Sequence, residues 1–286
     1  MQKKGVMRAC YCLLAGALLS LLGLACTASH GKKNKQELDQ SLQADNSAVM
    51  GRDAEIDTIR GRLHFAFLVP DRYRNDGGQP SDYQAKGWKG LYYDSLKDQC
   101  ISKEVQPQAS YQYDECTADS ALVISEQGGA VFFYRGLSSV AEPVPTARVD
   151  KWLFAGRSKQ FSLEGKPYQL IIKADCKWDD GTLISGDQIR ALAPDALMGR
   201  VKQVGFELLL QKEQGKATRF FRLDSLEYTN PSILWMGDLN KDGLPDLLID
   251  APVFMESSHY YFWLSDIKDP RAPLKLVDAV LVQRDC

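Results

Sequence analysis

Residues 204–211, VGFELLLQ, and residues 218–223, TRFFRL, are two runs of mostly apolar and aromatic side chains. Between them lies Glu213-Gln214-Gly215-Lys216, a polar connection that contains a glycine. Aromatic and β-branched residues favour strands, and a short connection with Gly between two such runs is typical of a β-hairpin. We therefore expect these two segments to pair in antiparallel fashion.

Similar short runs, separated by Gly, Pro, Asn and Asp, recur from about residue 63 to the end of the chain. A second hairpin is expected where Glu126-Gln127-Gly128-Gly129 separates two runs, and one short helix is expected at 187–192, before Pro194. The pattern predicts an all-β fold, mainly an antiparallel sandwich or barrel-like body with minor helix. The expected strands are 63–69, 87–93, 121–125, 130–135, 168–174, 177–184, 204–211, 218–223, 233–236, 247–249, 260–264 and 274–282.

The composition divides the chain into three parts. Residues 1–25 read as a leader, residues 26–55 as a flexible polar tether without aromatics, and residues 56–286 as a β-rich globular domain. The segment 140–147, with Pro143 and Pro145, either separates two β subdomains or crosses between sheets, and we favour one continuous body. The acidic loop described below occurs once, which disfavours a propeller.

The leader begins with Lys3, Lys4 and Arg8, continues with the apolar run 9–25 and ends in small residues around Cys26. A membrane-spanning anchor is the alternative, although the run is short for that role. Leu22-Gly23-Leu24-Ala25-Cys26 resembles the lipobox of bacterial lipoproteins, with Gly23 where the family prefers Leu. The resemblance implies a lipid on Cys26 and, because Thr27 rather than Asp follows, a cell-envelope protein of the outer membrane. Cleavage by signal peptidase I near residue 25 or 28 stays open.

Four of the seven cysteines lie in the expected body: Cys100, Cys116, Cys176 and Cys286. An even number of cysteines in an exported protein is typical of structural disulfides. We expect a disulfide-stapled body in which Cys100 pairs with Cys116 and Cys176 pairs with Cys286. The chain has no Cys-x-x-Cys pair and only three His, so zinc and thiol redox catalysis are poorly supported.

The segment Asp238-Leu-Asn-Lys-Asp-Gly-Leu-Pro-Asp246 places oxygen-bearing side chains at alternate positions around a turn. With Asp238 at position 1, a glycine stands at position 6, where a sharp turn needs a residue without Cβ. Oxygen ligands in such a loop are preferred by Ca²⁺. The sequence therefore predicts one Ca²⁺ site whose ligands are Asp238, Asn240, Asp242, the carbonyl of Leu244, and Asp246.

A turn capped by Asp and Asn side chains is the alternative to a metal site. Three crowded carboxylates repel one another unless a cation neutralises them, which favours the metal. We expect a structural ion that holds the strand ending at Met236 against the strand beginning at Asp246. Ile249 stands where an EF-hand has its bidentate Glu.

The loop between expected strands resembles the FG-GAP loops of integrin-type propellers and the loops of dockerins and thrombospondin type 3 repeats. With residues 246–250 and 260–265, it is also similar to uncharacterised exported bacterial proteins. These resemblances imply calcium binding but no activity.

The remaining residues carry little catalytic signal. The formal charge of −2 and the isoelectric point near 6.0 give no basic excess, so nucleic acid is not an expected partner. His259, with Ser257, Ser258 and Glu256 beside it, is the best candidate acid–base group, but adjacency in sequence does not build a triad. We expect a binding or structural module for an envelope or surface protein or a glycan, not an enzyme. The alternative is a periplasmic hydrolase acting on glycans or cell wall.

Overall fold

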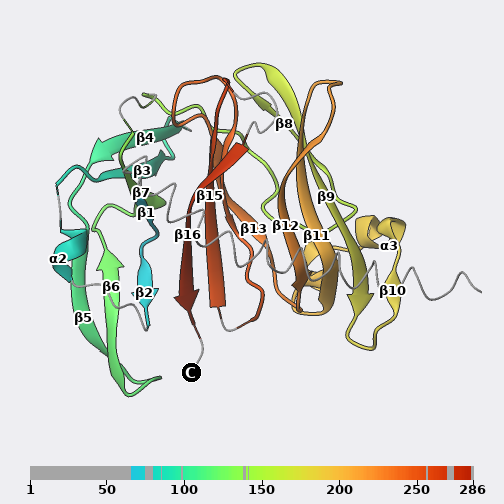
Figure 1. Cartoon of the computed structure of the whole chain (residues 1–286), viewed down its shortest axis with the longest axis horizontal. Coiled ribbons are helices and arrows are strands. Elements are labelled where there is room, and N and C mark those ends of the chain that lie inside the picture. Colours follow the sequence, from blue (N-terminus) through green and yellow to red (C-terminus); the bar gives the residue numbers. More distant parts are fainter. Residues whose placement is uncertain are drawn as a thin grey trace, which may run out of the picture. The chain divides into compact units, whose positions relative to one another are not determined.

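Antiparallel β-sheets make up most of the described part of the computed structural model (Figure 1), in agreement with the all-β prediction. The structure describes residues 66–74, 80–84, 86–97, 99–137, 140, 142–255, 257–268 and 274–284. The predicted leader and tether, the start of the first expected strand, Glu256 and Cys286 lie outside these residues.

The described elements are strands of 2 to 13 residues and three small helices. In chain order they are β1 (Ala66–Leu68), β2 (Asp71–Tyr73), α2 (Pro80–Tyr83), β3 (Lys89–Asp94), β4 (Gln99–Glu104), β5 (Gln108–Asp114), β6 (Asp119–Ser125), β7 (Phe132–Arg135), β8 (Lys159–Leu163), β9 (Lys166–Trp178), β10 (Leu183–Ile184), α3 (Gly186–Ala191), α4 (Pro194–Leu197), β11 (Val201–Lys212), β12 (Thr218–Leu226), β13 (Ser232–Gly237), β14 (Asp246–Asp250), β15 (Ser257–Ser265) and β16 (Leu274–Gln283).

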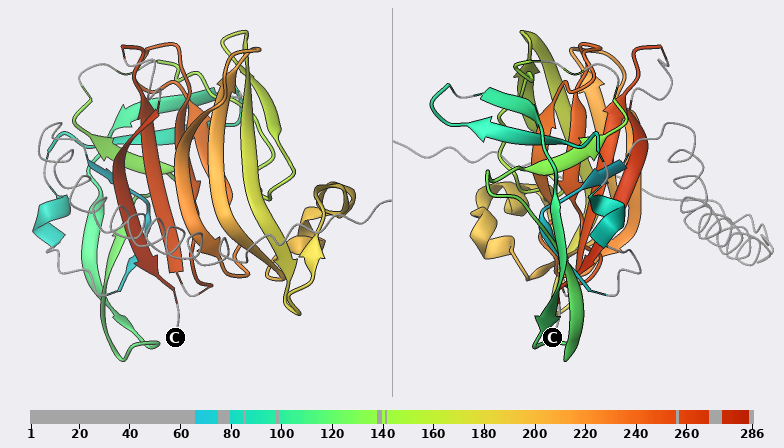
Figure 2. Two further views of the ribbon diagram at one scale, coloured as in Figure 1. Left: turned by 45° about the vertical axis from the view of Figure 1, so that its right-hand side comes forward. Right: turned by 90° about the vertical axis from the view of Figure 1, so that its left-hand side faces the viewer.

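These strands form four sheets within the described part of the chain. Two small sheets have the orders β1-β7-β3-β4 and β2-β6-β5. The third has the order β10-β9-β11-β12, with β8 paired to β9, and the fourth has the order β13-β14-β15-β16. The long strands of the last two sheets run roughly alongside one another, and the β5–β6 hairpin extends beyond the other strands at one end (Figure 2).

The β13–β16 sheet is buried on both faces. Leu248 and Phe262 belong to one apolar core, which they share with β1, β3 and β7. Their neighbours Leu247 and Trp263 belong to a second core, which they share with β9, β11 and β12. A sheet covered on both faces needs apolar residues at consecutive positions, and this explains the unbroken run of buried residues from 246 to 249.

Several predicted elements are confirmed. The hairpin predicted from residues 204–211 and 218–223 is β11–β12, with an antiparallel register from Gln203↔Leu226 to Leu210↔Thr218. The predicted helix is α3, whose first turn is capped by Ser185 in a reciprocal capping box with Gln188.

The hairpin predicted from 121–125 and 130–135 is wrong. β6 pairs with β2 and β5, whereas β7 pairs with β1 and β3, so the glycine connection passes between two sheets. The predicted break at Asp175 and Cys176 is also wrong. β9 continues through both residues, because a bulge in β11 near Gly205 takes up the irregularity between the two strands.

Both predicted disulfides are wrong, because each includes a cysteine that is a free thiol. Cys100 on β4 and Cys176 on β9 are free thiols, 3% and 4% exposed, and both lie in apolar cores. Cys116 is disulfide-bonded, to neither of these two. Buried cysteine packs as a small apolar residue, so the even number of body cysteines misled the pairing argument.

Candidate metal centre

The acidic loop lies between β13 and β14, as predicted. Gly237 at the end of β13 pairs with Asp246 at the start of β14, so the loop closes two neighbouring antiparallel strands. Lys241 and Gly243 have positive φ angles of 64° and 76°. Gly243 is position 6 of the loop, and its left-handed backbone agrees with the residue without Cβ that was predicted there.

Asp238 organises the turn through backbone N–H groups. Its Oδ1 accepts from the N–H of Asp242 at 3.1 Å, and its Oδ2 accepts from the N–H of Gly243 at 2.8 Å. Asn240 Oδ1 accepts from the same Asp242 N–H at 3.1 Å. These contacts draw the oxygens of Asp238 and Asn240 towards one side of the loop.

Asp246 is fully buried and joins three segments. Its Oδ2 accepts from the N–H groups of Leu239 and Asn240 at 2.7 and 3.3 Å. Its Oδ1 accepts from the N–H and the hydroxyl of Ser265, both at 2.7 Å. Each oxygen therefore already accepts two hydrogen bonds, and Asp246 ties the loop to the end of β15.

Sequence reasoning missed Ser265. Besides Asp246, its hydroxyl lies 2.9 Å from Asp242 Oδ1 and 3.4 Å from the carbonyl of Leu244, and its own carbonyl accepts from Asn240 Nδ2 at 2.8 Å. Ser265 thus contacts four of the five predicted ligand residues. The only sequence signal was its position at the end of the β15 run, 19 residues after Asp246.

A second element reaches the loop from the neighbouring sheet. Lys166 Nζ and the Tyr168 hydroxyl, both on β9, lie 3.4 and 3.3 Å from the carbonyl oxygen of Gly243. Burial raises the pKa of Tyr168, and the nearby charges of Asp242 and Asp238 raise it further. The loop therefore also fastens β9 to the β13–β14 turn.

Among the described residues, no cationic side chain forms an ion pair with the carboxylates of this loop. Asp238 and Asp246 are 3% and 0% exposed, and neither they nor Asp242 forms an ion pair with a described residue. Burial raises the pKa of Asp238. It also raises the pKa of Asp246 to about 7, although the hydrogen bonds from Ser265 and Leu239 lower it. Buried carboxylates without a positive partner are unfavourable in the charged form.

The side chains do not converge as a finished cage. Over the described ranges, no three His, Cys, Asp or Glu side chains meet in a metal-holding group. The loop oxygens point instead to backbone N–H groups and to the Ser265 hydroxyl. Of the leucines in and beside the loop, Leu239 and Leu247 are buried, whereas Leu244 is only partly buried.

The candidate acid–base residues lie elsewhere, at the start of β15. The backbone N–H of His259 donates to Asp250 Oδ1 at 3.0 Å, and burial lowers the pKa of the His259 ring. Ser258 Oγ accepts from Arg284 Nε at 2.6 Å. Arg284 also contacts Asp71 Oδ2 at 2.7 Å, so these groups form a network between β2 and the end of β16. Glu256 lies outside the described residues.

The aromatic side chains of β3 and β15, and Trp88 before β3, are mostly packed in the cores. Trp88, Tyr92, Tyr260, Phe262 and Trp263 are buried, and Tyr93 is half exposed. These side chains therefore serve mainly to pack the cores.

Comparison with protein-family models, with curated proteins and with solved structures found no significant match. Among the described helices, none has the length and apolar character that a membrane crossing requires.

Proposed function

We propose that this chain is an exported, lipid-anchored cell-envelope protein whose β-rich body holds one structural Ca²⁺ in the 238–246 loop. In this proposal it acts as a binding or structural module for an envelope protein or a glycan. The two cores on either face of the β13–β16 sheet support a layered, sandwich-like body.

The observation that carries the calcium proposal is the pair of buried, unpaired carboxylates, Asp238 and Asp246, with Asp242 beside them. Asx-turn capping accounts for the hydrogen bonds of the loop. It does not account for placing acidic groups where the charged form is penalised. A bound divalent cation removes that penalty by neutralising the carboxylates at the junction of β13, β14 and β15.

The donor set fits a hard cation with one adjustment. A carboxylate oxygen has two lone-pair directions. Asp238 accepts hydrogen bonds from the backbone N–H groups of Asp242, Gly243 and Lys241, so its four lone-pair directions leave room for a metal. Asn240 Oδ1 and the Leu244 carbonyl add neutral oxygens. Asp246 must release one of its hydrogen bonds, from Ser265 or Leu239, before it can act as a ligand. Ca²⁺ takes 6–8 oxygens, so water completes the shell.

The proposed location in the cell envelope rests on the leader alone. A lipid on Cys26 followed by a polar tether holds the body near a membrane without a spanning helix. Mass spectrometry of the mature protein should find an N-terminal Cys26 bearing a diacylglyceryl group. An unmodified N-terminus beyond residue 25 would instead assign cleavage to signal peptidase I.

The structural role of the ion is tested by melting the full chain in Ca²⁺ and in EDTA. An ion that binds only the native state stabilises it by mass action, by about 1.4 kcal/mol at ten times its dissociation constant. We expect the melting temperature to fall on chelation and to recover when excess Ca²⁺ is added. Mg²⁺ at the same concentration is the control, because its smaller, stricter octahedral shell suits this loop poorly. Equal melting in Ca²⁺ and EDTA would rule out a structural ion.

A further inference from the structure

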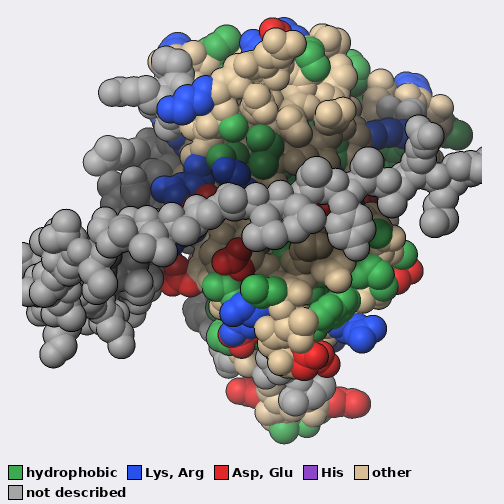
Figure 3. All heavy atoms as spheres, turned by 90° about the vertical axis from the view of Figure 1, so that its right-hand side faces the viewer, with side chains coloured by type: hydrophobic (Ala, Val, Ile, Leu, Met, Phe, Trp, Pro, Cys, Tyr) green, Lys and Arg blue, Asp and Glu red, His purple; other side chains and the backbone are tan. Residues whose placement is uncertain are grey.

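A hollow of about 650 Å³ opens beside β8, away from the acidic loop. Its lining carries three cationic side chains, Arg157, Lys159 and Arg190, and one carboxylate, Asp150. The other lining residues are Val149, Gly156, Ser158 and Gln160. Figure 3, which views the molecule from the side of β10 and α3, shows Lys and Arg side chains gathered near the middle of this face, with acidic side chains beside them.

Arg157 forms no ion pair with a described carboxylate. Its Nε and Nη2 donate to the carbonyl of Ile189 at 3.0 and 2.7 Å, and Nη2 also contacts the carbonyl of Leu192. These neutral oxygens end the last turn of α3 and hold the guanidinium in place. Its Nη1 makes no hydrogen bond to a described residue. The guanidinium is therefore fixed, and the two N–H bonds of its Nη1 can donate to an oxyanion.

Lys159 and Asp150, which both line the hollow, form an ion pair. Lys159 is 7% exposed. Although partial burial acts to raise it, the pKa of Asp150 is held below its ordinary value by the hydrogen bonds from Lys159 and Trp152 and by the charges of Lys159 and Arg157. The single lining carboxylate is therefore committed to Lys159, and two of the three lysine N–H bonds stay available.

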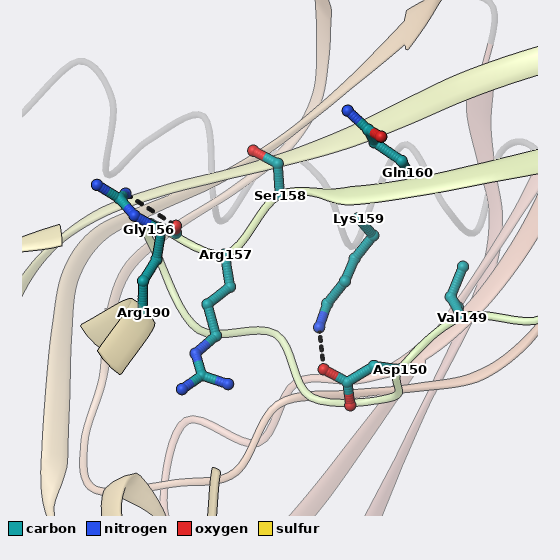
Figure 4. Close-up of a pocket in the computed structure, with 8 residues that line it drawn as sticks. All are labelled: Val149, Asp150, Gly156, Arg157, Ser158, Lys159, Gln160 and Arg190. Atoms are coloured by element: carbon teal, nitrogen blue, oxygen red, sulfur yellow. Dashed lines mark hydrogen bonds and ion pairs between the residues drawn. The ribbon is translucent and has the colours of Figure 1, made fainter. Parts of the chain in front are cut away.

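Arg190 lies at the rim, on α3. Its Nη1 donates to the carbonyl of Gly156 at 3.3 Å, and its Nη2 pairs with the exposed Asp187. Figure 4 shows that Arg157 and Lys159 extend to the same side of the chain, whereas Ser158 and Gln160 extend to the other. The two cationic heads thus flank one space.

The open edge of β8 adds backbone donors. β8 pairs only with β9 among the described strands, and Leu163↔Lys166 closes their two-residue turn. Hydrogen-bonded and non-hydrogen-bonded pairs alternate in an antiparallel ladder. The N–H and C=O of Gln160 therefore point away from β9, towards the unpaired edge that lines the hollow.

We propose that this hollow binds an oxyanion, a carboxylate or a phosphate, carried by a small molecule or a glycan. The anion sits between Arg157 and Lys159, with Arg190 at the rim. The proposal does not depend on calcium in the acidic loop, because the two places share no residue.

The test is calorimetric titration of the full chain with inorganic phosphate and, separately, with glucuronate, at constant ionic strength. We expect saturable binding of at least one anion, and roughly tenfold weaker binding in Arg190→Gln and in Arg157→Gln. Arg219→Gln on β12 is the matched control, since Arg219 is exposed and paired to Glu207. Binding of phosphate alone identifies a phosphoryl ligand, and binding of glucuronate alone identifies an acidic sugar or other carboxylate.

Two results would overturn the proposal: no saturable binding of either anion, or equal weakening in Arg219→Gln and Arg190→Gln. Arg157 also fastens the end of α3, so its variant is first checked by thermal melting. If Arg157→Gln is unfolded, Arg190→Gln decides alone, because its side chain is largely exposed and its loss leaves the cores intact.

Discussion

Replacement of Asp246 by alanine is expected to lower the free energy of unfolding by about 3 kcal/mol or more, because two buried N–H groups, of Leu239 and Ser265, then lose their acceptor. The Ser265 hydroxyl loses the same partner. An unmade hydrogen bond in a buried place costs more than a made one gains. Urea unfolding in EDTA at neutral pH measures the effect without a contribution from metal.

Asp266→Ala is the matched control for this experiment. Asp266 follows the same strand, is partly exposed and pairs with Lys275. Exposed ion pairs contribute only about 0–1 kcal/mol, so this variant should unfold close to the parent protein. If Asp246→Ala cost no more than Asp266→Ala, Asp246 would not hold the loop to β15.

Asp250 is expected to make the apo protein less stable as the pH rises from about 4 to 6. Burial raises the pKa of its carboxyl from 3.8 to about 6, although hydrogen bonds from His259 and Ser258 and the charge of Arg284 lower it. The folded state therefore favours the protonated carboxyl. This stabilisation is fully present below the unfolded pKa and is lost as the pH rises through the folded pKa. Its size is at most about 3 kcal/mol.

The comparison variant is Asp250→Asn, which keeps an acceptor for the His259 N–H and cannot ionise. Urea unfolding is measured from pH 4 to pH 8 in EDTA. As the pH rises through this window, the free energy of unfolding of Asp250→Asn should increase relative to that of the parent protein. Asp246 and the other acids act equally on both proteins and cancel in the difference. A constant difference across the window would mean that Asp250 is not shifted by burial.

Local sequence signals predicted the elements whose apolar pattern is strong. The β11–β12 hairpin, α3 and the strands on both sides of the acidic loop follow from runs of apolar residues and from glycine turns. The missed strands lack that signal. β5, for example, has exposed side chains at five of its seven positions in the β5–β6 hairpin, so no face of it is marked by apolar residues. β4 and β8 are likewise short and half polar.

Partners distant in the chain could not be predicted. The assignment of β6 and β7 to different sheets depends on pairing with strands that are remote in sequence, which outweighed the glycine turn between them. The ligand spacing of the loop was readable because it lies within nine consecutive residues. Ser265, Lys166 and Tyr168 reach the loop only through the fold, up to 77 residues away in the chain.

The acidic loop thereby connects parts of the protein that share no local sequence. Ser265 brings β15 to it, and Lys166 and Tyr168 bring β9. A cation there would reinforce the boundary between the β13–β16 sheet and the sheet that contains β9. This position supports a structural ion, because a catalytic ion needs an open coordination position beside acid–base groups.

Calorimetric titration of the metal-free full chain with CaCl₂ tests the central claim most directly. We expect one Ca²⁺ per chain and loss of that binding in Asp242→Ala, while Asp266→Ala keeps it. Asp242 is the informative position because its side chain is partly exposed, so its replacement leaves the buried bonds of Asp246 in place. No heat of binding, or an isotherm unchanged in Asp242→Ala, would contradict the account.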